Sequence, residues 1–404
     1  MPATGWARRG ACRRRTPDSS EQGFAALIVI IGGGVTGLST AFWLREMGHA
    51  VTLVEKGIVG WEASGRNGGG CTHPYSPLFR EEQRLWPTMD ERLGYPTEWR
   101  PYRIRVALDP GQMERMRSAT ELATAQGFPA EELDNRSLRE ICPWVGPDSV
   151  GMLWKYGGHA NPQRTAQAYA WAVADRGGTI LQHTAAQRIV TRGGRAVSVV
   201  TDKGEIPCEA VVVAAGPHTA RIAETFGVRV PLAPARAEMI VTEALPLLRM
   251  GGIDGNGLYG RQTLRGNLAY GGGPHEWIDL AGERTPRAVN SPVVAGLARR
   301  LAELFPRLPP VRVIRSWGGI IENTPDGRPV LERLADPANV VIATMSSVGF
   351  GLSPATGRAL AQLVVQGHCD FADLAQLKLD RFGNLPTDWR ARYGWLASDA
   401  ALAP

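Results

Sequence analysis

The 404-residue sequence has no apolar run long enough to form a membrane-spanning helix. Its longest such run, residues 24–31, is eight residues long, whereas a spanning helix needs about 20 residues. Cysteine is also scarce, because the chain has only five and none forms a Cys-x-x-Cys pair. This pattern excludes a disulfide scaffold and offers no ligand set for zinc or an iron–sulfur cluster, so we expect no metal site. It favours a reducing compartment, and we expect a cytoplasmic protein.

Acidic residues are fewer than basic ones, but the imbalance is local. The chain has 45 Lys and Arg against 39 Asp and Glu, a net charge of +6. Residues 1–23 hold five arginines against two acidic residues, which is half of the excess, and we expect this segment to be a disordered basic extension. A nucleic-acid partner is therefore not favoured. The hydrophobic content of 44% is typical of a globular protein with a large core.

The first folded segment reads as a β-strand, an α-helix and a second strand. Residues 25–31 are continuously apolar and rich in β-branched side chains, as in a strand buried on both faces of a parallel sheet. A helical pattern follows and ends at Gly48. Residues 51–54 then form a short apolar strand that ends at Glu55. Together they predict a right-handed βαβ unit.

Two other regions add strands to this unit. Short strands separated by glycine-containing turns predict an antiparallel meander at 180–182, 188–191, 196–201 and 205–208. A buried strand follows at 211–213. Near the C-terminus, a strand at 340–344 leads through a glycine-bearing loop, 345–352, to a helix that begins at Ser353 and Pro354.

The chain between these regions has a different pattern. Amphipathic strands at 236–241, 258–263 and 268–271, with one helix at 292–304, predict an antiparallel sheet in a second domain.

Gly32, Gly34 and Gly37 form the G-x-G-x-x-G pattern directly between the first strand and the first helix. In this context the first glycine permits a tight turn, the second lets backbone approach a pyrophosphate, and the third lets the helix pack on the strand. Glu55 lies 18 residues beyond Gly37, where a carboxylate accepts hydrogen bonds from a ribose. The combination predicts a dinucleotide site, although a solvated strand end is the alternative for Glu55.

Two further features favour a flavin over a nicotinamide dinucleotide. The second strand is followed by the polar, glycine-rich stretch 63–70, whose small side chains and backbone N–H groups suit a flat ring system. The helix after residue 352 would bring a second helix N-terminus, with about half a positive charge. A flavin that accepts hydride at N5 gains negative charge at N1 and O2, which a helix N-terminus stabilises.

Eight segments carry a specific resemblance, in one order along almost the whole chain after residue 24. They are VIIGGGVTGLSTAFWL (29–44), VTLVEKG (51–57), ASGRNGGG (63–70), GGHANPQR (157–164), VVVAAGPHT (211–219), GRQTLRGNLAYGGG (260–273), SWGGIIENTPDGRPVL (316–331) and VVIATMSSVGFGLSPATGRALAQL (340–363). The chain resembles the FAD-dependent amino-acid and amine oxidoreductases of the D-amino acid oxidase, glycine oxidase and sarcosine oxidase superfamily. ASGRNGGG and the RQT-x-x-G strand pair are most similar to subunits of opine and hydroxyproline dehydrogenases.

The resemblance implies an α/β fold class, with an FAD-binding Rossmann-like domain of the glutathione-reductase type and an interleaved α+β substrate domain built on an antiparallel sheet. The implied division is 24–80, 157–228 and 316–370 for the FAD-binding domain, 81–156 and 229–315 for the substrate domain, and 371–404 for a C-terminal tail.

The same resemblance assigns the cofactor-binding residues by matching position. They are Gly32, Gly34, Gly37, Glu55, Ser64, Arg66, Asn67, Gly68, Gly69, Ala186, Gly216, Gly319, Gly349, Phe350, Gly351 and Leu352. The glycines of 32–37 would face the pyrophosphate, Glu55 the adenosine ribose and Ala186 the adenine. The isoalloxazine would lie against 66–69, Gly319 and 349–352.

The departures from the family pattern are informative. Gly319 stands where monomeric sarcosine oxidase has the cysteine that tethers its flavin, so FAD is expected to be non-covalent. Ala269 stands where a lysine assists oxygen reduction, which predicts slow reaction with oxygen. Ile321 replaces the arginine that holds the substrate carboxylate in glycine oxidase. The common Gly-His-Gly-Phe loop is Ser-Val-Gly-Phe here, at 347–350.

Three residues are candidates for contact with the substrate. A carboxylate needs a cation, and strand alternation puts Tyr259 and Arg261 on one face, although an exposed sheet face is an equally good interpretation. His73 falls where sarcosine oxidase relatives have a carboxylate-binding arginine. It would hold the substrate or accept the amine proton, unless it is simply a solvent-facing loop histidine.

The predicted function is oxidation of the C–N bond of an amino acid or secondary amine acid. Hydride would pass to flavin N5 and give an imine that hydrolyses, with a dehydrogenase favoured over an efficient oxidase. The alternatives are a flavin subunit of a heteromeric opine-type dehydrogenase and a tRNA wobble-uridine-modifying FAD oxidase. The expected partners are a small amine or amino-acid substrate, an electron acceptor of unknown identity and a possible second subunit.

Overall fold

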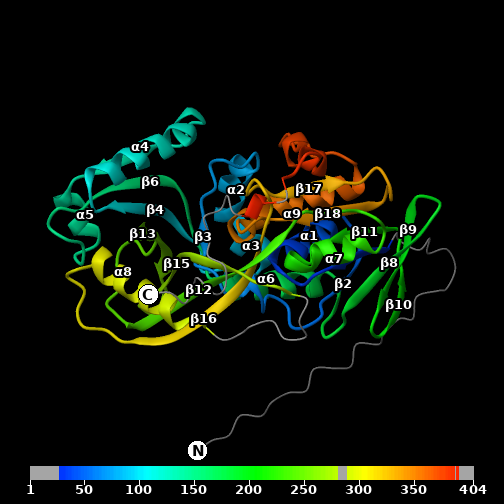
Figure 1. Cartoon of the computed structure of the whole chain (residues 1–404), viewed down its shortest axis with the longest axis horizontal. Helices are drawn as coiled ribbons and strands as arrows, with labels where there is room; N and C mark the ends of the chain where they lie inside the picture. Colours follow the sequence, from blue (N-terminus) through cyan, green and yellow to red (C-terminus); the bar gives the residue numbers. More distant parts are fainter. Residues whose placement is uncertain (1–26, 281–288, 387, 391–404) are drawn as a thin grey trace, which may run out of the picture.

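The structure, a computed structural model, describes residues 27–280, 289–386 and 388–390. The molecule is elongated, with a six-stranded sheet and its helices towards one end and a nine-stranded sheet with its helices at the other (Figure 1). A three-stranded sheet lies beyond the six-stranded one (Figure 1). The predicted α/β fold class is confirmed.

The six-stranded sheet has the order β17-β18-β11-β1-β2-β7, and all its pairs are parallel except β17 with β18. Its strands are β1 (Leu27–Ile31), β2 (Ala50–Val54), β7 (Thr179–Leu181), β11 (Ala210–Val213), β17 (Val330–Arg333) and β18 (Val340–Thr344). Ile28 and Ile30 of β1 belong to the apolar cluster on one face, whereas Val29 and Ile31 belong to the cluster on the other. Burial on both faces explains why this strand is apolar at every position.

Helices cover one face of this sheet. The long ones are α1 (Val35–Glu46), α6 (Pro162–Asp175) and α9 (Gly349–Val365), and the short α2 (Phe79–Leu85) and α3 (Met89–Leu93) lie beside them (Figure 1). Leu38, Tyr169 and Leu360, one from each long helix, share an apolar cluster with Ile30. On the other face, α7 (Thr219–Glu224) and the three-stranded sheet pack against β1 and β11.

The antiparallel meander contains three strands rather than the predicted four. They are β8 (Ala186–Arg192), β9 (Arg195–Thr201) and β10 (Gly204–Pro207). The first predicted strand, at 180–182, is β7, which pairs parallel with β2 at the edge of the six-stranded sheet. The prediction was wrong here because strand spacing does not distinguish a hairpin partner from the edge of another sheet.

The nine-stranded sheet has the order β16-β12-β15-β14-β13-β4-β6-β3, with β5 paired to β6. Its strands are β3 (Gly70–Cys71), β4 (Arg100–Ala107), β5 (Ala130–Leu133), β6 (Val150–His159), β12 (Ala233–Ala244), β13 (Ile253–Gly255), β14 (Leu258–Gln262), β15 (Asn267–Trp277) and β16 (Val313–Asn323). The predicted antiparallel pairing holds except between β13 and β4, which are parallel. That pair joins two segments far apart in the chain, which no local pattern predicts.

The two faces of this sheet differ in chemistry. Ile104 and Val106 of β4 and Leu258 of β14 lie in an apolar cluster with residues of α8 (Ser291–Leu304). The alternate residues, Arg103 and Arg105 of β4, are on the opposite face. That second face is covered in part by α4 (Pro110–Ala125), and α5 (Asn135–Ile141) packs at the end of the sheet (Figure 1).

Helix α9 begins at Gly349, four residues earlier than predicted, so 349–352 form its first turn rather than a loop. Pro354 lies inside the helix, where it lacks the N–H that normally bonds to the preceding turn. Contacts with α1 stabilise this irregular start. The Ser39 hydroxyl donates to the Ser353 carbonyl at 2.7 Å, and Trp43 Nε1 donates to the Pro354 carbonyl at 2.9 Å.

The predicted domain boundaries stay predictions, but sheet membership differs from them in places. β3 and β16 belong to the nine-stranded sheet, although the implied ranges put residues 70–71 and 316–323 in the FAD-binding domain. The expected disordered extension, 1–23, lies outside the described residues. Part of the expected tail is described: two short 3-10 helices at Ala375–Leu377 and Leu379–Phe382.

Substitution of Gly357 tests the packing of α9 on α1. A Cβ at this position would overlap the Ser39 side chain and backbone, so Gly357→Ala is expected to lower the free energy of unfolding by about 1–3 kcal/mol. Gly296→Ala is the matched control, because a Cβ at Gly296 of α8 meets nothing within 4 Å. It is expected to raise stability by up to about 1 kcal/mol. Denaturant unfolding of both variants measures the difference, and equal effects would contradict the packing argument.

Candidate functional site

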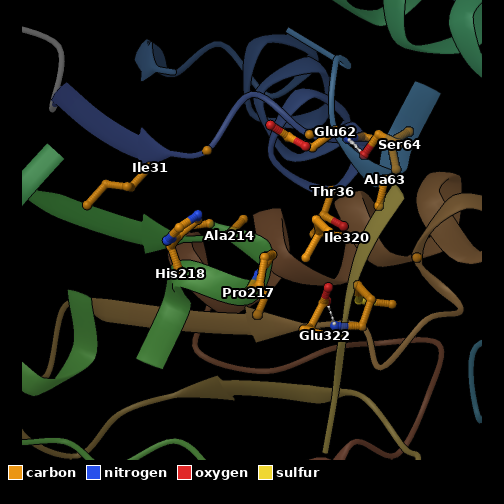
Figure 2. Close-up of a pocket in the computed structure, with 18 of the residues that line it drawn as sticks. Ile31, Thr36, Glu62, Ala63, Ser64, Ala214, Pro217, His218, Ile320 and Glu322 are labelled. Carbon is orange, nitrogen blue, oxygen red and sulfur yellow. Dashed lines mark hydrogen bonds between the residues drawn. The ribbon is translucent and has the colours of Figure 1, made fainter. Parts of the chain in front are cut away.

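An elongated pocket runs along the carboxyl ends of four parallel strands of the six-stranded sheet (Figure 2). Its lining includes Ile31 at the end of β1, Glu55 after β2, Ala214 after β11 and Met345 after β18. Open α/β sheets bind ligands outside the carboxyl ends of their strands. The position of the pocket therefore fits a bound nucleotide.

Two long helices begin at this pocket without a capping side chain. The N-cap residues are Gly34 for α1 and Val348 for α9, and neither makes a side-chain cap hydrogen bond. The first N–H of α1, from Val35, donates to the Ser64 hydroxyl at 2.9 Å. The other described helices of 14 residues or more have side-chain caps, from Asp109, Asn161 and Asn290. Apart from the Val35 N–H, the N–H groups of these two helix starts have no capping side chain, and they face a pocket in which they favour negative charge.

The glycine motif forms the turn between β1 and α1. Gly32 has a φ of 113°, which favours glycine. A Cβ on Gly37 would overlap the Gly32 carbonyl, so only glycine permits the helix to approach the strand this closely. A Cβ on Gly34 would meet only the Ser64 hydroxyl, at 3.1 Å. The environments of Gly32 and Gly37 match the turn and packing roles expected for the motif, and the role of Gly34 at a pyrophosphate stays a prediction.

Glu55 is part of the pocket rather than a solvated strand end. One carboxylate oxygen accepts the Gly33 N–H at 2.8 Å, and the other accepts the Gly57 N–H at 2.7 Å. The carboxylate therefore fixes the turns on both sides of it while its side chain lines the pocket.

The glycine-rich stretch 63–70 is held by its two central polar residues. The Asn67 amide donates to the Ala63 and Ser64 carbonyls, and its oxygen accepts the Gly69 N–H at 2.8 Å. Arg66 Nη1 donates to the Gly318 carbonyl of β16 at 2.9 Å. The stretch is therefore an ordered loop, anchored to the nine-stranded sheet. We call residues 66–69 the glycine loop.

Arg261 and Tyr259 both lie against the glycine loop. Arg261 Nη1 donates to the Gly68 carbonyl at 2.9 Å, and the side chain is 6% exposed. Burial lowers the pKa of Arg261 to about 10. Tyr259 is 36% exposed, and a Cβ on Gly68 would lie 3.1 Å from its ring. The two residues border different cavities, Arg261 one of about 400 Å³ and Tyr259 one of about 450 Å³.

His73 lies behind the start of α9. Its Nδ1 is 2.7 Å from a carboxylate oxygen of the fully buried Glu82, and a Cβ on Gly351 would overlap its ring. This pairing shows that the imidazole is not a solvent-facing loop residue. His73 does not line the elongated pocket.

The elongated pocket also contains polar residues that the sequence argument did not select. Glu322 of β16 accepts the Met345 N–H at 2.9 Å, and burial raises the pKa of its carboxyl (Figure 2). His218 Nε2 lies 2.7 Å from Lys56 Nζ. Burial, Lys56 and Arg221 lower the pKa of His218 to about 4. The sequence signals for these two residues were weak. Strand alternation does not distinguish Glu322 from other polar strand residues, and His218 belongs to no recognisable motif.

The predicted cofactor residues divide into two sets. Those that line the elongated pocket are Gly32, Gly34, Glu55, Ser64, Asn67, Ala186, Gly216, Gly349 and Phe350. Those that do not are Gly37, Arg66, Gly68, Gly69, Gly319, Gly351 and Leu352. Gly319 packs on Arg66 behind the glycine loop, and Leu352 is fully buried in the core.

Residues 28–363 match the family of FAD dependent oxidoreductases known as DAO. The chain belongs to this family. The predicted family resemblance and the FAD cofactor are therefore confirmed.

Individual members of the family cover nearly the same length. The chain is 29% identical to the beta subunit of sarcosine oxidase from Rhizobium meliloti over 374 residues, which is 88% of either protein. It is also 29% identical to an opine oxidase subunit of Rhizobium meliloti over 334 residues, covering 76% of this chain and 84% of that one. The structure of glycine oxidase from Geobacillus kaustophilus superposes with a TM-score of 0.80 at 25% identity, covering 88% of this chain and 98% of that one.

The pocket fits the FAD of this family. The N–H groups at the starts of α1 and α9 and the open side of Gly34 suit a phosphate-bearing, acceptor-rich ligand. Within the described residues, no three His, Cys, Asp or Glu side chains are grouped to hold a metal ion. No helix in that part of the chain is long and apolar enough to cross a membrane.

Glu55→Ala tests the attachment of FAD. Loss of the carboxylate leaves the Gly33 and Gly57 N–H groups without their acceptor, so the Kd for FAD is expected to rise about tenfold or more. Glu121→Ala, at an exposed position of α4, is the control and should leave the Kd unchanged. Flavin fluorescence during titration of apoprotein gives both constants. An unchanged Kd in Glu55→Ala would show that this carboxylate does not support the cofactor site.

Proposed function

We propose that the protein oxidises the C–N bond of an amino acid or a secondary amine acid, with the glycine loop as the support for the reacting end of FAD. The observation that carries this proposal is the contact of Arg261 and Tyr259 with Gly68. Because Gly68 follows Asn67, which lines the elongated pocket, the glycine loop connects this pocket to the polar face of the nine-stranded sheet. The names of the relatives, a sarcosine oxidase and an opine oxidase, support substrates with a C–N bond.

Different residues of the site would hold different parts of FAD. In this proposal the start of α1 faces the pyrophosphate, Glu55 the adenosine ribose and Ala186 the adenine, while 66–69 and the first turn of α9 support the isoalloxazine. Bound FAD supplies the two-electron acceptor for hydride from the carbon beside nitrogen. The N-terminus of α9 favours the negative charge that follows.

Arg261 and His73 have positioning roles in this proposal. Arg261 holds the glycine loop through the Gly68 carbonyl, and Glu82 orients the His73 ring beside Gly351. Direct contact of either residue with the substrate stays a prediction. The same is true of the cytoplasmic location.

A second subunit is part of the proposal. Two relatives of nearly the same length, one from sarcosine oxidase and one from opine oxidase, are named as subunits of those enzymes. We therefore propose that this chain is the FAD-carrying subunit of a heteromer. Action on a tRNA wobble uridine is not favoured, since the similar proteins are amino-acid and amine oxidases.

Anaerobic reduction of the holoprotein tests the reaction class. Amines with a carboxylate, such as N-methyl amino acids, D-amino acids and opines, are expected to bleach the visible absorbance of the oxidised flavin, because they transfer two electrons to it. 2-Hydroxy acids of the same carbon skeleton are the control and should leave the absorbance unchanged. Bleaching by the hydroxy acids alone would contradict a C–N specificity.

Stopped-flow reoxidation tests the role of Ala269. Ala269 lines the cavity next to Asn67 and Arg261, and none of the described residues that line this cavity is a lysine. Reduced protein is expected to react slowly with oxygen and faster with an artificial acceptor. Ala269→Lys should accelerate the oxygen reaction by roughly tenfold or more through electrostatic stabilisation, whereas Ala269→Met should not. Rapid wild-type reoxidation in air would contradict the prediction of a dehydrogenase rather than an efficient oxidase.

A further inference from the structure

One face of the nine-stranded sheet carries three arginines that are buried or partly buried. Arg103 and Arg105 alternate along β4, and Arg261 lies on β14. Two of them have partners that account for their charge or their orientation. Arg103 forms a buried ion pair with Asp254 of β13, and Arg261 donates to the Gly68 carbonyl. The third, Arg105, has no such partner among the described residues.

The acidic residue opposite Arg105 on β13, Asp254, already accepts hydrogen bonds from other donors. Its oxygens accept hydrogen bonds from Arg103 and from the Gly260 N–H, the latter at 3.0 Å. In the part of the chain that the structure describes, no carboxylate lies within ion-pair distance of Arg105. Its Nε is buried and has no hydrogen-bond partner there. Arg105 is partly exposed, but a charged group with a buried donor that lacks an acceptor costs free energy, and a bound anion would lower that cost.

The guanidinium of Arg105 is held in place by an aromatic stack. It lies 4.3 Å from the Trp154 ring, and Trp154 stacks on Tyr156 with ring planes 12° apart. Burial lowers the pKa of Arg105, although its ordinary value is so high that the group stays charged at neutral pH. The charge is thus fixed in position before any ligand arrives, which reduces the ordering cost of binding.

Arg105 lines a cavity of about 450 Å³ between β4, β13, β14 and α4. Arg115 of α4 lines it as well, whereas its acidic lining residue, Asp254, is already paired with Arg103. Tyr259 also lines this cavity and packs against Gly68. The cavity therefore extends from a cation without an ion-pair partner to a side chain that contacts the glycine loop.

We propose that Arg105 is the carboxylate anchor of the substrate, and that the cavity beside Tyr259 takes an amine acid with its carboxylate at this guanidinium. The assignment rests on the proposed function, because it places an amine acid in that cavity. The assignment also accounts for Ile321, which stands where glycine oxidase has its carboxylate-binding arginine. In this protein the positive charge would come from β4 instead of β16.

Equilibrium binding of thioether and ether isosteres tests the assignment without turnover. (Methylthio)acetate, thiodiacetate and tetrahydrofuran-2-carboxylate carry a carboxylate but have no C–N bond to oxidise. Their Kd for the FAD-loaded protein is measured by flavin absorbance and by calorimetry. Arg105→Gln is expected to raise the Kd by about ten- to one-hundredfold, and Arg105→Lys by less, because lysine keeps the charge but loses the two-pronged geometry.

Two control variants separate this site from its neighbours. Arg136→Gln removes a charge from a side chain that is 89% exposed on α5, and should leave every Kd unchanged. Arg261→Gln reports on the other candidate cation. FAD content and thermal unfolding of each variant show that the fold is retained, and Arg105→Lys gives a second reading if Arg105→Gln does not fold.

The outcomes are distinct. An increase in Kd confined to the Arg105 variants supports the assignment. An unchanged Kd in folded Arg105 variants, an increase in Arg261→Gln alone, or no binding of any isostere to the wild type would overturn it. If amines reduce the flavin but the isosteres bind independently of Arg105, only this inference fails. If the isosteres need Arg105 but no amine reduces the flavin, the proposed function fails instead.

Discussion

Backbone N–H groups at the starts of α1 and α9 need acceptors, and neither helix has an N-cap side chain that accepts from them. Ser64 accepts only the first N–H of α1, so the other N–H groups of these two helix starts remain open to an acceptor in the pocket. In three other long helices, the side chain of an N-cap Asp or Asn accepts hydrogen bonds from the first N–H groups. At α1 the N-cap residue is Gly34, and a Cβ there would meet only the Ser64 hydroxyl, so the space beside this helix start is left open. The strand order of the six-stranded sheet brings both helix starts to one edge. Packing of α9 on α1 helps to hold the two helix starts at this edge.

Local patterns predicted the parts of the fold that depend on neighbouring residues. The apolar run before Gly32, the spacing from Gly37 to Glu55 and the polar residues inside 63–70 each describe a single turn or element, and the structure has them as expected. The start of α9 was missed for a tertiary reason. Proline normally marks a helix start, whereas here it lies inside a helix whose Ser353 and Pro354 carbonyls accept hydrogen bonds from Ser39 and Trp43 of α1, a contact between distant parts of the chain.

The polar residues on the nine-stranded sheet were less predictable, because their positions depend on pairing between strands that are distant in the sequence. Alternation correctly put Tyr259 and Arg261 on one face, but nothing in the sequence indicated that Arg103 and Arg105 share that face. Their neighbours on β13 are residues 253–255, which pair with residues 104–106 of β4 although the two segments are far apart in the sequence. Charge on this face is unusual for a sheet interior, because each buried guanidinium requires an acceptor. Pairing with Asp254 and with the Gly68 carbonyl provides two of those acceptors within the chain.

The parallel contact of β13 with β4 also bears on how the chain reaches its native state. Sheets built from pairings of high contact order fold slowly, because loop closure must precede most of the stabilising contacts. Here β11 pairs with β18, and β12 pairs with β16, across long stretches of chain. During synthesis neither large sheet is complete until the last third of the polypeptide has emerged. Fragments cut near the middle of the chain would leave strand edges of both sheets unpaired, which favours aggregation over independent folding.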